Sequence, residues 1–384
     1  MAPITILADE NIPFALDAFS TLGDVRLAPG RQISRGDLRD VDMLIVRSIT
    51  PINADLLAGT RVRFVATATS GSDHVDVTDL DRLGIRFFAA LGCNANAVAE
   101  YMAAAWVVTA RRLGCRLAGR SVGIIGVGRV GSLVAEKARA LGMTPVLNDP
   151  PKARETGSAC YRPIADLLDC DIVTCHTPLT LNGPDPTWRL IGEPFLARLK
   201  PGAWFCNAGR GEVVDEAALH ASLDRGERGA VILDVWENEP AIDGRLVSRV
   251  EISTPHIAGY SLEGKLNGTA MVYDAACRFL GVTPSWDAAA AAPLPTVPVA
   301  TLDAGAATAE GALASVITAV YPIERDSAAL RATAGVERAD RGRQFDQLRK
   351  AYPVRREFRQ TRVVHRGTPA AVIEILRALQ FEVA

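Results

Sequence analysis

The sequence predicts an α/β fold with two doubly wound parallel-sheet domains and a small C-terminal α+β domain. Short apolar runs alternate with stretches of helical periodicity over most of residues 4–280, as in parallel sheets covered by helices on both faces. The length of 384 residues corresponds to two or three domains of ordinary size. A Pro- and Ala-rich segment at 284–300 interrupts the alternation and is typical of a linker or an extended crossing segment.

In the first region, three apolar runs are expected to form buried strands, at 4–8, 42–46 and 64–67, with a helix over 13–22. Arg47 and Ser48 follow the second run and Thr69 follows the third. Ligands of parallel α/β sheets bind beyond the carboxyl ends of the strands, so these three residues are candidate ligand contacts. Ordinary turn chemistry would explain the same residue types equally well.

The most specific motif in the chain is Gly126-Val-Gly128-Arg-Val-Gly131. An apolar strand at 121–125 precedes it, a helical stretch over 130–141 follows, and a second strand at 144–148 ends in Asp149. A GxGxxG loop between strand and helix, with an acidic residue about 20 positions later, is the fingerprint of dinucleotide binding. In this context the motif predicts a dinucleotide site.

Each residue of the fingerprint has a physical role. Gly126 permits the tight turn, Gly128 lets the backbone approach the pyrophosphate, and Gly131 allows the helix to pack closely on the strand. The pyrophosphate is expected at the N-terminus of the helix. Asp149 is expected to bind the ribose hydroxyls, and its carboxylate would repel a 2′-phosphate, which favours NAD over NADP.

Four more apolar runs, at 171–175, 203–206, 231–235 and 251–253, complete the dinucleotide domain. A long apolar helix over 100–113 is expected to connect it with the first domain, and a helical stretch ending near Leu280 to return there. The predicted domains are therefore 1–96 with 256–283, then 97–255, and finally 284–384. In the last, helices near 310–321 and 369–379 and a strand at 362–365 are expected.

Composition and charge exclude several classes of protein. A formal net charge of −2 gives no general reason to expect nucleic acid or an anionic membrane as a partner. No apolar run reaches the 18 residues of a membrane span, and the N-terminus does not resemble a signal peptide. The seven cysteines contain no CxxC pair and the five histidines are scattered, which indicates reduced thiols in the cytosol and argues against a metal site.

Three residues with catalytic potential follow late strands of the dinucleotide domain: Arg210, Glu239 and His256. Oxidation of an alcohol needs a base for the hydroxyl proton, and an imidazole suits this task. Glu239 would orient the ring of His256 and favour its protonated form. Arg210 offers a planar fork for a substrate carboxylate.

The order Arg, Glu, His after this loop resembles the D-2-hydroxyacid dehydrogenase family. So do the phrases His176-Thr-Pro-Leu179, Leu199-Lys-Pro-Gly202 and Pro255-His-Ile-Ala-Gly259. The resemblance implies a flavodoxin-like substrate domain and a Rossmann domain that binds NAD. Besides the three glycines, a closer match to one branch of this family assigns cofactor contacts to Arg129, Val130, Asp149, Thr177, Ala208, Gly209, Arg210, Asp234 and Gly259, and substrate contacts to Ser48, Thr69 and Tyr260.

Other phrases match one branch of this family, among them Leu7-Ala-Asp-Glu-Asn-Ile-Pro13, Gly71-Ser-Asp-His-Val-Asp76 and Phe345-Asp-Gln-Leu-Arg-Lys350. That resemblance implies a cytoplasmic homodimer that oxidises 4-phospho-D-erythronate to (R)-3-hydroxy-2-oxo-4-phosphooxybutanoate with NAD, in pyridoxal 5′-phosphate synthesis, and whose C-terminal domain supports dimerisation. Two alternatives stay open. A dehydrogenase of 3-phosphoglycerate would share the catalytic residues, and an NAD-sensing binding module would share the fold.

The substrate phosphate is expected to contact Arg47. An arginine from the C-terminal domain of a second copy could assist, with Arg349, Arg355 and Arg356 as candidates, because residues 325–366 hold 12 basic side chains against 5 acidic ones. A solvated charged surface is the favoured explanation for most of these residues.

Overall fold

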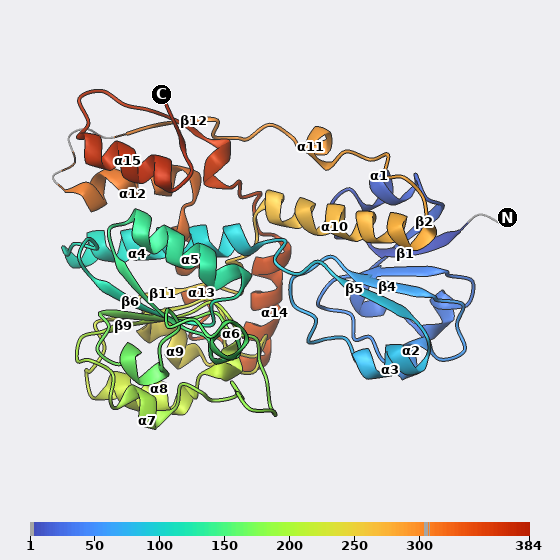
Figure 1. Ribbon diagram of the computed structural model, residues 1–384, viewed down its shortest axis with the longest axis horizontal. Coiled ribbons are helices and arrows are strands. Elements are labelled where there is room, and N and C mark those ends of the chain that lie inside the picture. The colour runs from blue at the N-terminus through green and yellow to red at the C-terminus, as the bar shows by residue number, and fades with distance from the viewer. Residues whose placement is uncertain (1–3, 303–305, 307) are drawn as a thin grey trace. The chain divides into compact units, whose positions relative to one another are not determined.

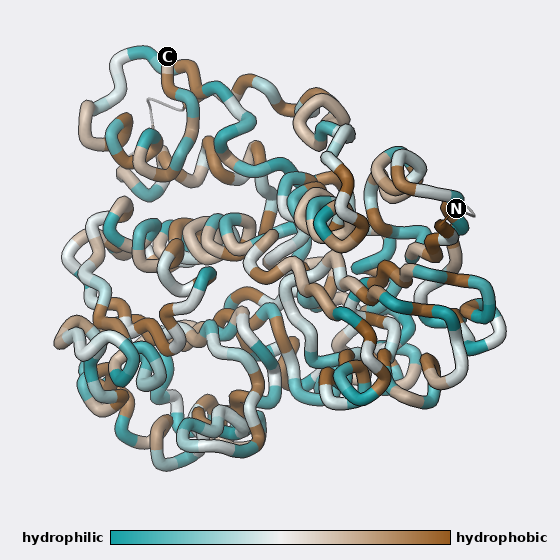
Figure 2. Tube along the Cα trace, turned by 45° about the vertical axis from the view of Figure 1, so that its right-hand side comes forward, coloured by the Kyte–Doolittle hydropathy of each residue, from teal (hydrophilic) through white to brown (hydrophobic). Residues whose placement is uncertain are grey.

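The computed structural model describes residues 4–302, 306 and 308–384, and the chain divides into two compact units. Unit 1 comprises Met1–Asn94 and Tyr260–Leu294, and unit 2 comprises Ala95–Gly259 and Pro295–Ala384. Figure 1 labels the elements of both. Figure 2 colours the trace by hydropathy, and hydrophobic stretches recur along it between hydrophilic turns. Within the described part of the chain, every helix is too short or too polar to cross a membrane.

Unit 1 is built on a five-stranded parallel sheet of order β2-β1-β3-β4-β5. The strands are β1 (Thr5–Asp9), β2 (Asp24–Ala28), β3 (Met43–Val46), β4 (Phe64–Thr67) and β5 (Arg86–Ala89). This is the flavodoxin-like order, as the sequence predicted. The central strands β3 and β4 are fully buried, whereas the edge strands β2 and β5 are partly exposed and carry charged residues, so no apolar run announced them.

Helices cover both faces of this sheet. On one face, α1 (Ala15–Phe19) and α10 (Leu262–Leu280) bury Phe19, Val272 and Tyr273 against the strands. The other face is covered by α2 (Ala54–Leu57) and α3 (Val77–Arg82), which bury Leu57 and Leu80. The expected first helix over 13–22 is shorter than predicted. A four-residue helix, α11 (Ala288–Ala291), lies in the Pro- and Ala-rich segment.

Unit 2 contains a six-stranded parallel sheet of order β11-β10-β9-β8-β6-β7. The strands are β6 (Ser121–Ile125), β7 (Thr144–Asn148), β8 (Ile172–Cys175), β9 (Trp204–Asn207), β10 (Ala230–Leu233) and β11 (Ile252–Ser253). All were predicted to within two residues. Strands β8, β9 and β10 are four-residue runs in which every side chain is buried, so each appears in the sequence as a continuous apolar run. Its helices are α4 (Ala95–Leu113), α5 (Arg129–Ala140), α6 (Pro150–Thr156), α7 (Glu193–Leu196), α8 (Glu216–Asp224) and α9 (Gly244–Arg249).

The C-terminal segment adds a small three-stranded parallel sheet, β12 (Val299–Thr301), β13 (Arg362–Val364) and β14 (Glu382–Val383). Its helices are α12 (Ala309–Val320), α13 (Ile323–Arg331), α14 (Arg338–Lys350) and α15 (Ala370–Ala378). Helix α12 packs on α4 and α15 packs on α5 (Figure 1). One apolar core therefore runs from the α4 residue Trp106 to Leu313 and Leu376 of the C-terminal segment.

Candidate active site

All six strands of the unit 2 sheet run parallel, so their carboxyl ends share one edge. The chain passes from β6 to β7 on one side and then to β8 on the other, which puts the topological switch point between β6 and β8. The loops at this edge carry, in strand order from β6 to β11, Gly126–Gly131, Asp149, Thr177, Ala208–Arg210, Asp234 with Glu239, and His256.

The glycine loop has the geometry that the fingerprint requires. Gly126 has a φ of 84°, and a Cβ atom there would lie 2.9 Å from the backbone of His176. A Cβ on Gly131 would lie 2.0 Å from the Gly126 carbonyl oxygen, so this helix–strand contact tolerates only glycine. A Cβ on Gly128, by contrast, would meet nothing within 4 Å, which leaves open space above the N-terminus of α5.

Asp149 caps α6 and also braces the glycine loop. Its Oδ1 accepts from the backbone N–H of Lys152 at 3.0 Å, and its Oδ2 accepts from that of Val127 at 2.8 Å. Lys152 in turn donates from Nζ to the Val127 carbonyl at 2.5 Å. The acidic residue of the fingerprint is thus held next to the loop, and each carboxylate oxygen keeps a second lone pair for a ribose hydroxyl.

Two buried polar atoms lie at the end of β8. Thr177 Oγ1 and His176 Nδ1 are shielded from solvent and have no hydrogen-bond partner among the described residues. Burial lowers the pKa of His176 to about 3, so its ring is neutral at physiological pH. Buried polar groups without partners are rare unless a ligand or water satisfies them. With the glycine loop beside them, these atoms fit a bound dinucleotide.

The loop after β9 is fixed by Asn207. Its side chain accepts from the backbone N–H of Gly209 at 3.0 Å and donates to the Arg210 carbonyl at 2.8 Å. Gly209 lies tightly against the next strand end, since a Cβ there would be 3.0 Å from the Thr177 carbonyl oxygen. The Arg210 guanidinium donates from Nη1 to the Gly209 carbonyl at 2.9 Å, which holds the side chain at the strand edge.

His256 and Glu239 form a close pair, with Nδ1 and Oε2 2.7 Å apart. The other oxygen of Glu239 accepts from the backbone N–H of Trp236 at 2.9 Å. Burial alone would raise the pKa of Glu239, but the charge and hydrogen bond of His256, together with Arg349, hold it below its ordinary value. The ionised carboxylate of Glu239 therefore accepts a hydrogen bond from the Nδ1–H group of His256. The other ring nitrogen, Nε2, is then the one that can accept a proton from a substrate.

The loop that carries His256 is held by Asp234. His256 has a φ of 55°, unusual for a residue with a side chain, and its N–H donates to the Asp234 carbonyl at 2.7 Å. The Asp234 carboxylate then accepts from the N–H groups of Ile257 and Ala258, both at 2.8 Å. Thr254 Oγ1 donates to the same carboxylate at 2.7 Å. Asp234 was predicted as a cofactor contact, and its role in this loop has no signature in the sequence.

The predicted substrate contacts lie in unit 1. Arg47 and Ser48 follow β3 and Thr69 follows β4, so all three are at the carboxyl edge of that sheet. Arg47 forms an ion pair with the buried Asp9 at the end of the neighbouring strand, 3.1 Å from Nε to Oδ2. Tyr260 precedes α10, and the Lys265 ammonium lies 4.6 Å from its ring centre.

The C-terminal arginines differ in their surroundings. Arg355 is 6% exposed and donates to two backbone carbonyls of its own unit. Arg356 is 7% exposed, whereas Arg349 lies 5.9 Å from the ring of Phe345 in α14. A side chain buried among its own neighbours, as Arg355 is, cannot reach the substrate of a second copy without leaving them.

The comparisons with known proteins decide the family. The model described as D-isomer specific 2-hydroxyacid dehydrogenase, NAD binding domain, matches residues 88–258, and a domain of unknown function matches 293–379. An erythronate-4-phosphate dehydrogenase from Cronobacter sakazakii is 47% identical over 354 residues, which cover 92% of each chain. One from Marinobacter nauticus is 43% identical over 98% of this chain and 99% of that one. The chain belongs to the erythronate-4-phosphate dehydrogenase family.

The family assignment makes NAD the cofactor of unit 2. A solved structure of NAD⁺-bound 3-phosphoglycerate dehydrogenase from Entamoeba histolytica covers 73% of this chain and 96% of its own, with 24% identity and a TM-score of 0.63. That similarity shows a shared fold. The NAD-binding model ends at residue 258, so it includes Arg210, Glu239 and His256 but not Tyr260.

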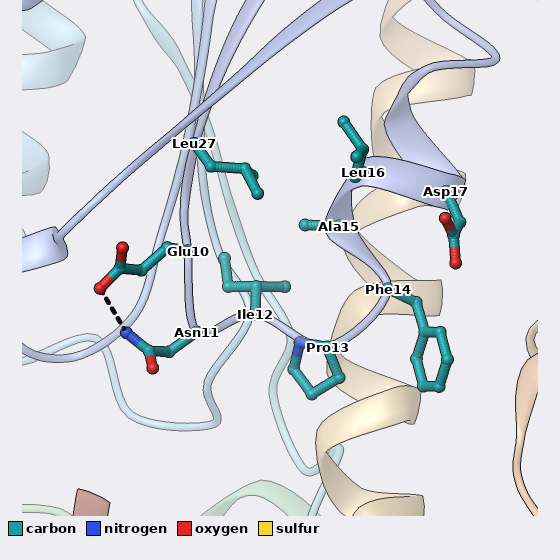
Figure 3. Close-up of a pocket in the computed structure, with 9 residues that line it drawn as sticks. All are labelled: Glu10, Asn11, Ile12, Pro13, Phe14, Ala15, Leu16, Asp17 and Leu27. Atoms are coloured by element: carbon teal, nitrogen blue, oxygen red, sulfur yellow. Dashed lines mark hydrogen bonds between the residues drawn. The ribbon is translucent and has the colours of Figure 1, made fainter.

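This member of the erythronate-4-phosphate dehydrogenase family also has a shallow open pocket of about 360 Å³ in unit 1 (Figure 3). Residues 10–17 line it together with Leu27, and Glu10 and Asp17 give it a negative charge. None of the predicted substrate contacts lines it, and its carboxylates would repel a phosphate. We therefore do not assign the substrate to this pocket.

Proposed function

We propose that this chain oxidises 4-phospho-D-erythronate to (R)-3-hydroxy-2-oxo-4-phosphooxybutanoate with NAD. The observation that carries the proposal is the pair of His256 and Glu239, which leaves one ring nitrogen available as a base. The name shared by relatives that match nearly the full length supplies the substrate.

NAD supplies the acceptor for the hydride that leaves C2 of the substrate. The hydroxyl proton passes to Nε2 of His256, so the C2 alcohol becomes a ketone and the ring becomes an imidazolium. Glu239 stabilises this cation, since its own pKa is depressed and its carboxylate lies 2.7 Å from Nδ1. In the reverse direction the imidazolium returns the proton to the carbonyl oxygen.

Arg210 binds the substrate carboxylate and polarises the developing carbonyl, because a guanidinium offers two parallel N–H donors. The cofactor contacts are those that the loops present: the three glycines with Arg129 and Val130 at the start of α5, then Asp149, Thr177, Ala208 to Arg210, Asp234 and Gly259. The backbone N–H groups of Arg129 and Val130, at the N-terminus of α5, and the open space at Gly128 suit the pyrophosphate.

Ser48, Thr69 and Tyr260 contact the rest of the substrate, and Arg47 binds its phosphate. Asp9 keeps Arg47 in place through Nε, which leaves the outer guanidinium nitrogens to form charge-assisted bonds with a phosphate. The enzyme acts as a cytoplasmic homodimer in pyridoxal 5′-phosphate synthesis, with residues 284–384 as its dimerisation domain.

The first test is NADH formation from NAD with 4-phospho-D-erythronate and, separately, with 3-phosphoglycerate, each compared with a control that contains a 2-keto acid. Selective turnover of phosphoerythronate supports the proposal, and preference for phosphoglycerate would reject the substrate while keeping the mechanism. If neither is oxidised although NAD binds, an NAD-sensing module becomes the better reading. His256→Gln is the control variant, because it should bind NAD and lose turnover.

A further inference from the structure

The loop that carries His256 is held from two sides. Asp234 receives the N–H groups of residues 256 to 258 through its carbonyl and carboxylate oxygens. The Ala258 carbonyl, which belongs to the next peptide group, accepts from Arg355 Nη2 at 2.5 Å. Arg355 belongs to the C-terminal segment, 97 residues further along the chain. Ala258 is therefore held through its backbone N–H by Asp234 and through its backbone carbonyl by Arg355.

The same nitrogen of Arg355 also reaches the start of α4, where it donates to the Ala97 carbonyl at 3.3 Å. Ala97 and Ala258 are close in sequence to the two points at which the chain passes between units, 94/95 and 259/260. One guanidinium thus joins the two segments of unit 2 that lead to these crossings.

The guanidinium of Arg355 is buried, and its Nη1 has no hydrogen-bond partner among the described residues. Arg355 is 6% exposed, and its guanidinium carbon lies 4.3 Å from the ring centre of the buried Tyr321. Burial of a guanidinium has a large desolvation cost. Ala258 is only 2% exposed, so replacing Arg355 would leave the Ala258 carbonyl without a hydrogen-bond donor. Gly259, which follows, has no Cβ to restrict the rearrangement.

We propose that Arg355 is a positioning residue for His256. It acts through the Ala258 carbonyl, so the C-terminal segment of each chain supports the active site of that same chain. The inference rests on the proposed role of His256 as the base. It predicts that loss of the Arg355 guanidinium slows the chemical step more than it weakens NAD binding, because the glycine loop and Asp149 are held by other contacts.

The test compares Arg355→Met with Arg331→Met. Arg331 is a matched control, since it also belongs to the C-terminal segment and donates to backbone carbonyls of unit 2, at Ser248, Val250 and Glu251. None of its acceptors lies in the loop of residues 254–259. For Arg355→Met we expect kcat to fall by about 10- to 100-fold, as for a displaced catalytic group, with the Kd for NAD within about twofold of the parent.

Two readouts separate positioning from general stability. Added guanidinium ion should restore part of the kcat of Arg355→Met and none of any loss in Arg331→Met. Hydrogen exchange of residues 254–259 should accelerate in Arg355→Met beyond its rate in Arg331→Met, and this readout does not depend on the substrate. If Arg355→Met does not fold, Arg355→Lys takes its place, with the same expectations and a smaller loss of kcat.

Equal kcat values and equal loop exchange in the Arg355 and Arg331 variants would overturn the inference. If His256→Gln turned over as fast as the parent, the proposed role of His256 as the base would be rejected. The hydrogen-exchange experiment would then still test whether Arg355 holds the loop of residues 254–259.

Discussion

The chemistry proposed for His256 depends on which of its ring nitrogens carries the proton. Glu239 Oε2 faces Nδ1 at 2.7 Å, and the other carboxylate oxygen is engaged by the Trp236 N–H at 2.9 Å. The carboxylate can therefore neither rotate away nor be replaced by water without loss of two hydrogen bonds. This arrangement selects the tautomer in which Nε2 is the base.

Replacing Glu239 by glutamine should invert that choice. The Trp236 N–H keeps the amide oxygen on its side, so the amide nitrogen would face His256 and force Nδ1 to accept. The proton would then sit on Nε2. We expect kcat to fall by about 100-fold or more, with NAD binding nearly unchanged, as measured by steady-state kinetics and NADH fluorescence. A kcat within threefold of the parent would contradict the proposed role.

Arg47 allows a test of phosphate recognition. For Arg47→Ala, we expect KM for 4-phosphoerythronate to rise by about 10- to 100-fold, the value of one or two charge-assisted hydrogen bonds. KM for unphosphorylated erythronate should change little. Because the substitution leaves the buried Asp9 unpaired, folding is checked first by thermal unfolding, and Arg47→Lys serves as the control that retains the charge. Equal effects on both substrates would exclude a phosphate contact.

At the junction of β6 and α5, two glycines differ in the space available for a side chain. Gly131 has no room for a Cβ, since the Gly126 carbonyl oxygen would be 2.0 Å away, whereas Gly128 faces open space with a φ of −71°. The fold itself requires glycine at position 131. Glycine at position 128 is required only if a ligand approaches the backbone there.

Alanine at these two positions should therefore have different effects. Gly131→Ala must move α5 away from β6, and we expect a loss of about 1–3 kcal/mol in the free energy of unfolding together with weaker NAD binding. Gly128→Ala should leave the melting temperature unchanged and weaken NAD binding alone. Thermal unfolding and NAD titration of both variants would test this. An unchanged Kd in Gly128→Ala would argue against a pyrophosphate at the loop.

The helices and strands differ in how clearly the sequence predicts them. The central strands β3, β4, β8 and β9 are buried on both sides, and each appears as a continuous apolar run. The edge strands β2, β5 and β14 meet solvent and lack that run. Helices α13 and α14 were not predicted. Helix α14 is rich in charge and buries only Arg341, Gly342 and Phe345 of its 13 residues, so its apolar periodicity is weak.

At the scale of the molecule, the C-terminal segment shares a buried polar cluster with the start of α4. Glu100 is 2% exposed, and both of its carboxyl oxygens accept from the Phe358 N–H at 3.0 Å. Asn96 donates to Glu100 and to the fully buried Glu357, at 3.0 and 2.8 Å. Burial, and then the charge of Glu357, raise the pKa of Glu100 to about 8, with Lys137 and Arg355 opposing the shift.

This cluster should make stability depend on pH. The pKa of Glu100 is higher in the folded chain than its ordinary value of 4.5, so the folded state binds more protons between the two values. Its stabilising contribution is complete below about pH 4.5 and is lost as the pH rises to about 8, with a slope of at most about 1.4 kcal/mol per pH unit. The free energy of unfolding, measured with urea at several pH values in this range, should fall less steeply with pH for Glu100→Gln than for the parent. Parallel curves would refute the assignment.

The candidate site was predictable where one segment holds the whole signal. The glycine loop, the acid after β7 and the three strand-end residues could be named because each lies in a short motif next to an apolar strand. The residues that hold them were not predictable. Asp234 is separated by 20 residues from Thr254, and nothing local indicates that its carboxylate gathers the N–H groups of the next loop.

The α/β class, the strand-loop-helix unit for the dinucleotide and the residue types of the catalytic set could be predicted from the sequence, because they follow from local hydropathy and local backbone geometry. The contact of Glu239 with His256, the ion pair of Asp9 with Arg47 and the hydrogen bond of Arg355 to the Ala258 carbonyl are visible only in the folded chain. Such contacts join positions far apart in the chain. Each depends on the packing of whole elements, which no single segment encodes.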